Sequence, residues 1–207
     1  MARKPLTKPR KAAAQDRSRA TVDALVEATA RILVKEGFDK ASTNRIAEQA
    51  GVSIGSLYQY YPGKEALVAA VIDRHNEEIM RLVLPAFAEI DMLPVEIGVR
   101  RLVAVAIEAH RIDPRLHSVL AEQIPRTGRL ADVEAFGRQT YALFRTYLAA
   151  HSDELRVADL DMAAFVAVTT IEALAHTAVL SSQKMLPDQT VRTLVDETTR
   201  LVVGYLT

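Results

Sequence analysis

The stretch that most constrains the fold of this chain is residues 42–64, STNRIAEQAGVSIGSLYQYYPGK. Ser42 or Thr43 can cap one short helix, and Ser53 can cap a second. Gly51 lies between the two, where a sharp turn favours a residue that tolerates a left-handed backbone. Two short helices joined by such a turn form a helix-turn-helix, which places its second helix in the major groove of DNA.

The second helix of this motif has the side chains that such a role requires. The side chains expected to form a small core are Ile46, Ala47, Ala50, Val52 and Leu57. Those expected to face outward are Ser53, Ile54, Gly55, Ser56 and Tyr58. Small residues permit close approach to base edges, serine hydroxyls donate or accept hydrogen bonds, and isoleucine packs on a thymine methyl group.

Three further polar residues are predicted to bind phosphate. Thr43, Tyr60 and Lys64 have hydroxyl or ammonium groups near helix N-termini or the edge of the groove. Backbone N–H groups at the start of the second and fourth predicted helices add to this site. Contacts of this kind set the register of a protein on DNA without reading its sequence.

The charge of the chain is unevenly distributed, although the net charge is zero. Residues 1–64 hold 12 Lys and Arg against 6 Asp and Glu, whereas residues 65–207 hold 14 against 20. Such asymmetry favours a polyanion as the partner of the first part. An excess of cations in a solvated tail is the alternative, because residues 1–15 are rich in Pro, Lys and Ala and are predicted to be disordered.

Apolar residues recur with helical spacing along the whole chain, so the predicted fold class is all-α. The first helix begins near Asp16, and a long fourth helix runs from Lys64 to about Leu84, where Pro85 is expected to end or kink it. Further helices are predicted at about 95–111, 114–122, 128–150, 157–182 and 188–206. No alternating strand pattern and no internal repeat is present.

Composition excludes several classes of protein. The chain has no cysteine, which removes disulfides, thiolate zinc sites and thiol redox sensing. The N-terminus lacks the apolar segment of a secretory signal, and the longest unbroken apolar run is too short to span a bilayer. H-E-x-x-H, P-loop, G-x-S-x-G and dinucleotide motifs are absent. We therefore expect a soluble, cytoplasmic protein that is not an enzyme and has no cofactor or metal.

Residues 17–64 resemble the N-terminal DNA-binding domain of the TetR/AcrR family of bacterial transcriptional repressors. The matching pieces are A-x-x-I-L-x-x-x-G-F, T-N-R-I-A-x-x-A-G-V-S and G-S-L-Y-x-Y-Y-x-x-K-E-x-L. The resemblance adds Asn44 and Arg45 of the T-N-R segment to the DNA-binding residues. It implies a helix-turn-helix domain over 16–63 after the tail 1–15, and a C-terminal helical bundle over 64–207 for ligand binding and dimerisation.

The resemblance also implies a mechanism. Family members are homodimers that place their third helices in successive major grooves of a palindromic double-stranded DNA operator. A ligand bound in the C-terminal bundle moves the fourth helix, changes the separation of the two DNA-binding heads and releases the operator. Such a ligand must have a higher affinity for the DNA-incompetent state of the protein than for the DNA-competent state.

An effector pocket in the bundle is implied by the same resemblance, and its candidate residues are His110, Phe136, Tyr141, Phe144, Phe165, Thr169 and His176. For each of these residues taken alone, an ordinary place in the core is the favoured interpretation, and the pocket is expected of the domain as a whole. The expected effector is a small hydrophobic molecule, uncharged or weakly anionic. Glu172 and His176 stand one helical turn apart, which could suit a metal, but a helix-surface hydrogen bond is the simpler interpretation.

The last two predicted helices have long apolar faces, and in the family such a pair forms the dimer interface. The residues predicted there are Val168, Ile171, Ala175, Leu194, Leu201, Val202 and Tyr205. Isologous dimers match palindromic DNA sites. The alternative is a DNA-binding regulator whose bundle docks a protein partner or only dimerises, with no small-molecule effector. An enzyme housed in the bundle is a third, weaker hypothesis.

Overall fold

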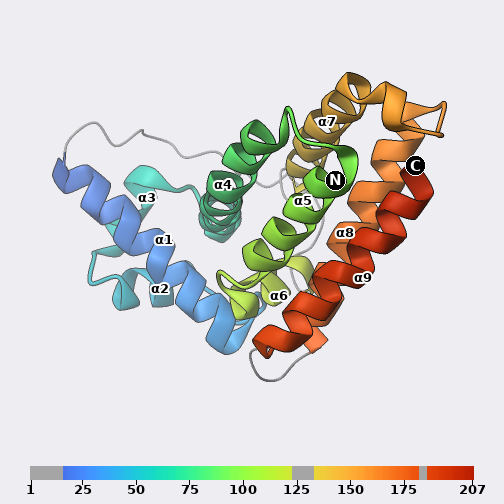
Figure 1. Cartoon of the computed structure of the whole chain (residues 1–207). Helices are drawn as coiled ribbons and strands as arrows, with labels where there is room; N and C mark the ends of the chain where they lie inside the picture. The colour runs from blue at the N-terminus through green and yellow to red at the C-terminus, as the bar shows by residue number, and fades with distance from the viewer. Residues whose placement is uncertain (1–15, 123–132, 182–185) are drawn as a thin grey trace, which may run out of the picture. The chain divides into compact units, whose positions relative to one another are not determined.

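The computed structural model describes residues 16–122, 133–181 and 186–207, and the side chains of residues 18–122, 138–180 and 186–207. These residues form helices and no strand, which confirms the predicted all-α class (Figure 1). The helices are α1 (Asp16–Glu36), α2 (Thr43–Gln49), α3 (Ile54–Tyr60), α4 (Lys64–Ile90), α5 (Val95–His110), α6 (Pro114–Glu122), α7 (Val133–Ala150), the short 3-10 helix η2 (Ser152–Glu154), α8 (Leu160–Ser181) and α9 (Asp188–Leu206). The tail 1–15 lies outside the described residues.

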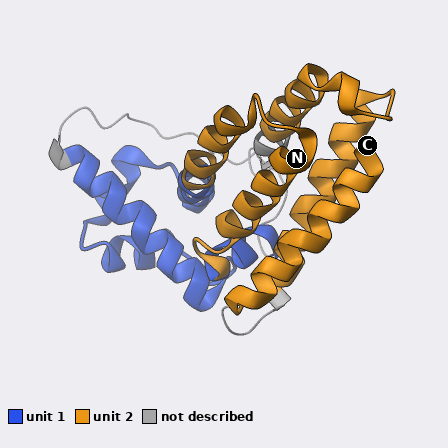
Figure 2. Ribbon diagram, in the orientation of Figure 1, with its two compact units in different colours: residues 1–76, 115–133 blue, residues 77–114, 134–207 orange. Residues whose placement is uncertain are grey.

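The chain divides into two compact units, which Figure 2 shows in separate colours. Unit 1 comprises residues 1–76 and 115–133, and unit 2 comprises residues 77–114 and 134–207. The division falls inside α4, so this helix contributes its first part to unit 1 and its second part to unit 2. The predicted boundary between a DNA-binding domain (16–63) and a ligand-binding and dimerisation domain (64–207) stays a prediction.

Unit 1 has a core that joins α1 to the helix-turn-helix. Buried apolar side chains from α1, α2, α3 and the start of α4 meet there, and the fully buried ones include Leu25, Leu33, Ile46, Leu57 and Leu67. They fall on one face of each helix because apolar residues recur three and four positions apart. This packing, rather than the propensity of helices seven residues long, stabilises α2 and α3.

The fourth helix extends beyond its predicted end. Pro85 lies inside α4, which continues to Ile90. Proline has no N–H, so the carbonyl of Arg81 loses its usual helical partner. Ala86 and Ile90 are both buried in the core of unit 2, and this packing stabilises the last turns after the proline. The expectation that the helix ends near Leu84 was therefore wrong.

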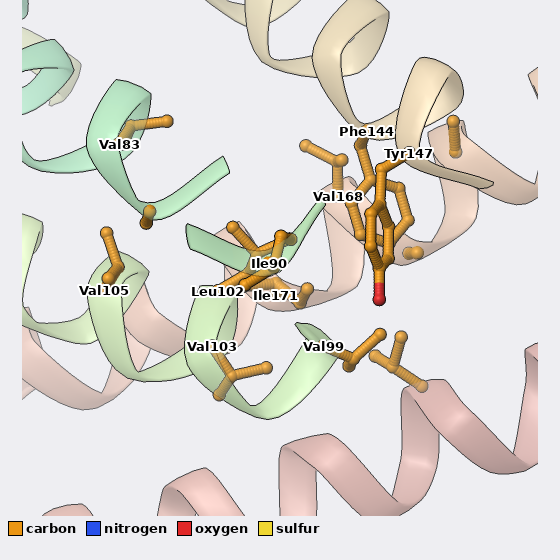
Figure 3. Packing of buried hydrophobic residues seen from close by; sticks show 14 of the residues in the cluster. Val83, Ile90, Val99, Leu102, Val103, Val105, Phe144, Tyr147, Val168 and Ile171 are labelled. Carbon is orange, nitrogen blue, oxygen red and sulfur yellow. The ribbon is translucent and has the colours of Figure 1, made fainter. Parts of the chain in front are cut away.

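Unit 2 is a helical bundle in which α5 packs against α8 and α9. Figure 3 shows side chains of its core, in which Phe144 and Tyr147 of α7 lie near Val168 of α8, and Ile171 of α8 lies with Ile90 and Leu102. Two hydrogen bonds join the loop after α7 to other parts of unit 2. The Glu154 carboxylate accepts one from Val95 N at 2.9 Å, and Leu206 O accepts one from Arg156 N at 2.8 Å.

Residues Leu160–Leu180 of α8 are long and apolar enough to cross a membrane by length and composition alone, with a mean hydropathy of 1.6. The expectation that no segment is long and apolar enough to span a bilayer needs correction, because that expectation considered only unbroken apolar runs. Single polar residues such as Thr169 and Glu172 interrupt this segment without lowering its mean hydropathy enough. A core helix of a helical bundle passes the same test, and α8 packs on α5 and α9.

Candidate nucleic-acid interface

The turn between α2 and α3 is built as the sequence predicts. Gly51 has a φ of 69°, in the left-handed region that favours glycine. Ser42 caps α2 by accepting a hydrogen bond from Arg45 N at 3.4 Å, and Ser53 caps α3 by accepting one from Ser56 N at 3.1 Å. Local hydrogen bonds therefore define the start of both helices of the helix-turn-helix.

The outer side of α3 carries four exposed residues, which we call the reading face: Ile54, Gly55, Tyr58 and Gln59. Gly55, Tyr58 and Gln59 follow Ile54 by one, four and five positions, which places all four residues on one side of the helix. Leu57 and Tyr60 lie on the opposite side and are buried. Since Leu57 anchors α3 in the core of unit 1, the reading face has a fixed orientation on that unit.

Gln59 was not among the predicted DNA-binding residues. Its side-chain amide has a donor and an acceptor, the pair that binds N6 and N7 of adenine in the major groove. Counting α3 positions from the buried Leu57 would have found it, because Gln59 lies two positions further along the helix and falls on the exposed side.

Two hydroxyl pairs lie beside the reading face. Thr43 Oγ1 and Tyr58 Oη are 3.1 Å apart and link α2 to α3. Ser53 Oγ and Ser56 Oγ are 2.9 Å apart, within the cap of α3. Ser56 is half-buried and takes part in this cap, whereas Ser53 is exposed. The predicted roles of these four residues on DNA stay predictions.

Tyr60 and Tyr61, at the end of α3, are buried in unit 1. Tyr60 is 8% exposed, and its Oη donates a hydrogen bond to Ser18 Oγ of α1 at 3.2 Å. Burial raises the pKa of Tyr61 to about 12, and Asp23 and Asp73 add to this effect. Tyr60 therefore joins α3 to α1, and a phosphate contact by its hydroxyl stays a prediction.

The cationic candidates have partners within unit 1. Arg45 forms a double hydrogen bond with the carboxylate of Glu36, in which Nη2 and Oε1 are 2.5 Å apart. Lys64 Nζ donates to Phe38 O at 3.0 Å and lies 4.1 Å from the centre of the Phe38 ring. An ammonium has three donors, so this bond leaves Lys64 with capacity for a phosphate. Asn44 is exposed.

The predicted pocket residues of unit 2 lie in different environments. Phe144 is 1% exposed and belongs to the core, whereas Phe165 is 54% exposed. Tyr141 stacks on Phe165, with ring centres 6.1 Å apart, and its Oη is 3.0 Å from Thr169 Oγ1. His110 and His176 meet edge to face at 5.9 Å. The side chain of Phe136 lies outside the described residues.

The predicted dimer-interface residues divide in the same way. Those buried within unit 2 are Val168, Ile171, Ala175 and Val202, and Leu194 is half-buried. Leu201 is 58% exposed and Tyr205 is 39% exposed, so their side chains are the accessible part of the predicted set. Met162 of α8 was not predicted, and it is also exposed.

Both parts of the chain match models of one protein family. Residues 25–71 match the model described as bacterial regulatory proteins, tetR family. Residues 94–206 match the tetracyclin repressor-like C-terminal domain, and this match alone covers more than half of the chain.

Curated relatives match only the N-terminal part. The HTH-type transcriptional repressor KstR of Mycolicibacterium smegmatis is 34% identical over 55 residues, which are 27% of this chain and 27% of KstR. The HTH-type transcriptional repressor DrrR1 of Streptomyces coeruleorubidus is 41% identical over 54 residues, which are 26% of this chain and 20% of DrrR1. The matches therefore span about a quarter of the length of these relatives or less.

Solved structures match nearly the whole chain. The fatty acid degradation regulator FadR of Bacillus halodurans has a TM-score of 0.71 at 19% identity, over 89% of this chain and 95% of FadR. FadR of Bacillus subtilis, in complex with stearoyl-CoA, has a TM-score of 0.70 at 17% identity, over 89% and 99%. At these identities the likeness shows the fold alone. Since family models match both parts, the chain belongs to the TetR family of bacterial regulatory proteins, which are DNA-binding transcriptional regulators and not enzymes.

Proposed function

We propose that this regulator is a cytoplasmic, dimeric repressor that binds a palindromic operator and leaves it when a small hydrophobic effector binds unit 2. The reading face of α3 is the observation that carries this proposal. It presents one exposed apolar group, one hydroxyl and one amide beside a glycine, on a helix held by a buried leucine. These groups match the contacts that read base edges in a major groove.

A dimer is supported by the apolar side chains that α8 and α9 leave uncovered. Met162, Leu201 and Tyr205 are exposed on two helices that pack against each other. A second copy of the chain would cover them on both protomers at once, because an isologous contact uses the same surface twice. Two reading heads related by a twofold axis then match a palindromic site.

Effector control is supported by the course of α4. This helix has 27 residues without interruption, and it contributes to the cores of both units. At about 1.5 Å per residue it spans roughly 40 Å, so a small rotation of one end displaces the other by ångströms. A ligand that favours one position of α4 would shift the population of DNA-competent dimers. The stearoyl-CoA complex of the Bacillus subtilis regulator is an example of an apolar ligand on this fold.

The direct test of the proposed DNA binding is selection of bound duplexes from a random DNA library. The selected sequences would then be titrated at several salt concentrations. Enrichment of a palindrome is expected, with half-sites about one helical turn apart or a multiple of it. Binding that selects no sequence and disappears with salt would contradict specific readout.

Replacement of Lys64 by alanine should weaken binding to every duplex by a similar factor. A lost phosphate contact lowers the slope of log K against log salt concentration by about one. Lys35→Ala is the matched control, because Lys35 is an exposed cation at the end of α1, outside the helix-turn-helix. Loss confined to one base position, with an unchanged salt slope, would contradict the phosphate role of Lys64.

Replacement of Ile54 or Gln59 by alanine should instead change the preferred base at particular positions, by about 1–3 kcal/mol each. Gln59→Ala is expected to lose a preference for adenine, because the amide is removed. Repetition of the selection with each variant measures this directly. Ser56→Ala in the same experiment separates the predicted reading role from a role in the cap alone. Uniform weakening across all sequences would remove a residue from the reading set.

A further inference from the structure

One side of α8 in unit 2 carries three polar side chains and a phenylalanine, and it is partly exposed to solvent. The residues on this side are Phe165, Thr169, Glu172 and His176. The last three follow Phe165 by four, seven and eleven positions, which places all four on one side of the helix. Three of these residues have named contacts to neighbouring helices. Glu172 lies between Thr169 and His176.

Two other helices contact this face, one on each side of Glu172 along α8. Tyr141 of α7 pairs with Thr169 through hydroxyl groups 3.0 Å apart, three residues before Glu172. His110 of α5 meets the ring of His176, four residues after it. The His110 ring has a fixed orientation, because its Nδ1 donates to Ala106 O at 2.7 Å. Glu172 is therefore flanked by polar groups that already bind one another.

The carboxylate of Glu172 has no hydrogen bond and no ion pair among the side chains that the structure describes. The residue is half-buried, and burial raises its pKa above the ordinary value. The hydrogen bond to His176 that the spacing suggested is not formed. A carboxylate in such a place loses part of its hydration without a replacement, which favours any ligand that supplies a donor or a positive charge.

We propose that Glu172 binds the ammonium group of an apolar effector, so that the molecule sensed by unit 2 is an amphipathic amine. This inference rests on the proposed effector function, and it replaces the expectation of an uncharged or weakly anionic effector with a cationic one. A hydrogen bond from an ammonium to a carboxylate is roughly twice as strong as a neutral one. Tyr141, whose hydroxyl pairs with Thr169 one turn before Glu172, stacks on Phe165, and such rings attract a cation and also pack against an apolar chain. A carboxylate effector would instead meet a like charge.

Three probes with the same chain and different head groups test the proposal: decylammonium, decanol and decanoate, each below its micelle concentration. Binding to the full chain would be measured by calorimetry at neutral pH, and release of the selected operator by fluorescence anisotropy. Decylammonium is expected to bind at least about tenfold more tightly than the other two, as a charge-assisted contact implies.

The decisive variant is Glu172→Gln, with Glu96→Gln as its control, because Glu96 is an exposed carboxylate of the same unit on α5. Glu172→Gln should lose the preference for the ammonium while still binding decanol, and it should raise the Tm of the free protein. Glu96→Gln should behave as the unchanged chain. A folded Glu172→Gln protein that keeps the preference would overturn the proposal.

Failure of the proposal and failure of effector sensing give different results. Equal or tighter binding of decanol or decanoate, with release of the operator, would overturn the role of Glu172 and leave an effector function in place. Absence of binding by all three probes would overturn the role of Glu172. If the operator also stays bound in their presence, the result counts against effector sensing by unit 2.

Discussion

Replacement of Phe144 by alanine should lower the free energy of unfolding by about 3–5 kcal/mol. Phe144 is 1% exposed and packs in the core of unit 2, where Figure 3 shows it beside Tyr147. Removal of a buried ring costs its transfer free energy, and the cavity that remains adds to this because neighbouring helices relax only in part. Urea denaturation followed by far-UV circular dichroism measures the change.

Phe165→Ala is the matched control, because the same ring is removed from a side chain that is 54% exposed. Its effect on stability should be much smaller. The comparison also tests the predicted pocket, which includes both phenylalanines. A nearly neutral Phe144→Ala that loses effector binding would assign Phe144 to a ligand cavity. A large loss of stability at Phe144 alone would assign it to the core.

Replacement of Gly98 by alanine should destabilise unit 2 by about 1–3 kcal/mol, although alanine is the better helix former. A Cβ at this position would clash with Tyr147 Oη and would lie 2.7 Å from Tyr147 Cζ. Tyr147 is buried, and its hydroxyl is 3.2 Å from Leu93 O, to which it donates. The Tyr147 ring or the backbone of α5 must shift to accept the added Cβ, and either shift weakens this hydrogen bond.

Gly204→Ala provides the control in the same unit. An added Cβ at Gly204, in α9, meets no atom within 4 Å. This variant should be neutral or more stable by up to about 1 kcal/mol, as helix propensity implies. The double variant Gly98→Ala with Tyr147→Phe should regain part of the loss, because removal of Oη removes the shortest contact and leaves those with Cζ and Cε1. Equal responses at the two glycines would contradict the proposed clash.

The sequence alone determined the features that depend on neighbouring residues. Ser42 and Ser53 cap α2 and α3, and Gly51 adopts a positive φ, because these preferences arise within a few bonds of the backbone. The apolar spacing predicted the helices, and with the caps and the turn it predicted the helix-turn-helix. The sequence placed the end of α4 near Leu84, but the helix continues to Ile90 because packing outweighed the effect of Pro85.

Tertiary structure alone decided which side of each helix is accessible. Tyr58 and Tyr60 look alike in the sequence, yet Tyr58 is exposed and Tyr60 bonds to α1. Burial at such positions depends on helices distant in the sequence, so a pattern within one helix cannot assign it. Glu172 shows the same limit, because its spacing to His176 favours a hydrogen bond that its carboxylate does not form with any side chain that the structure describes.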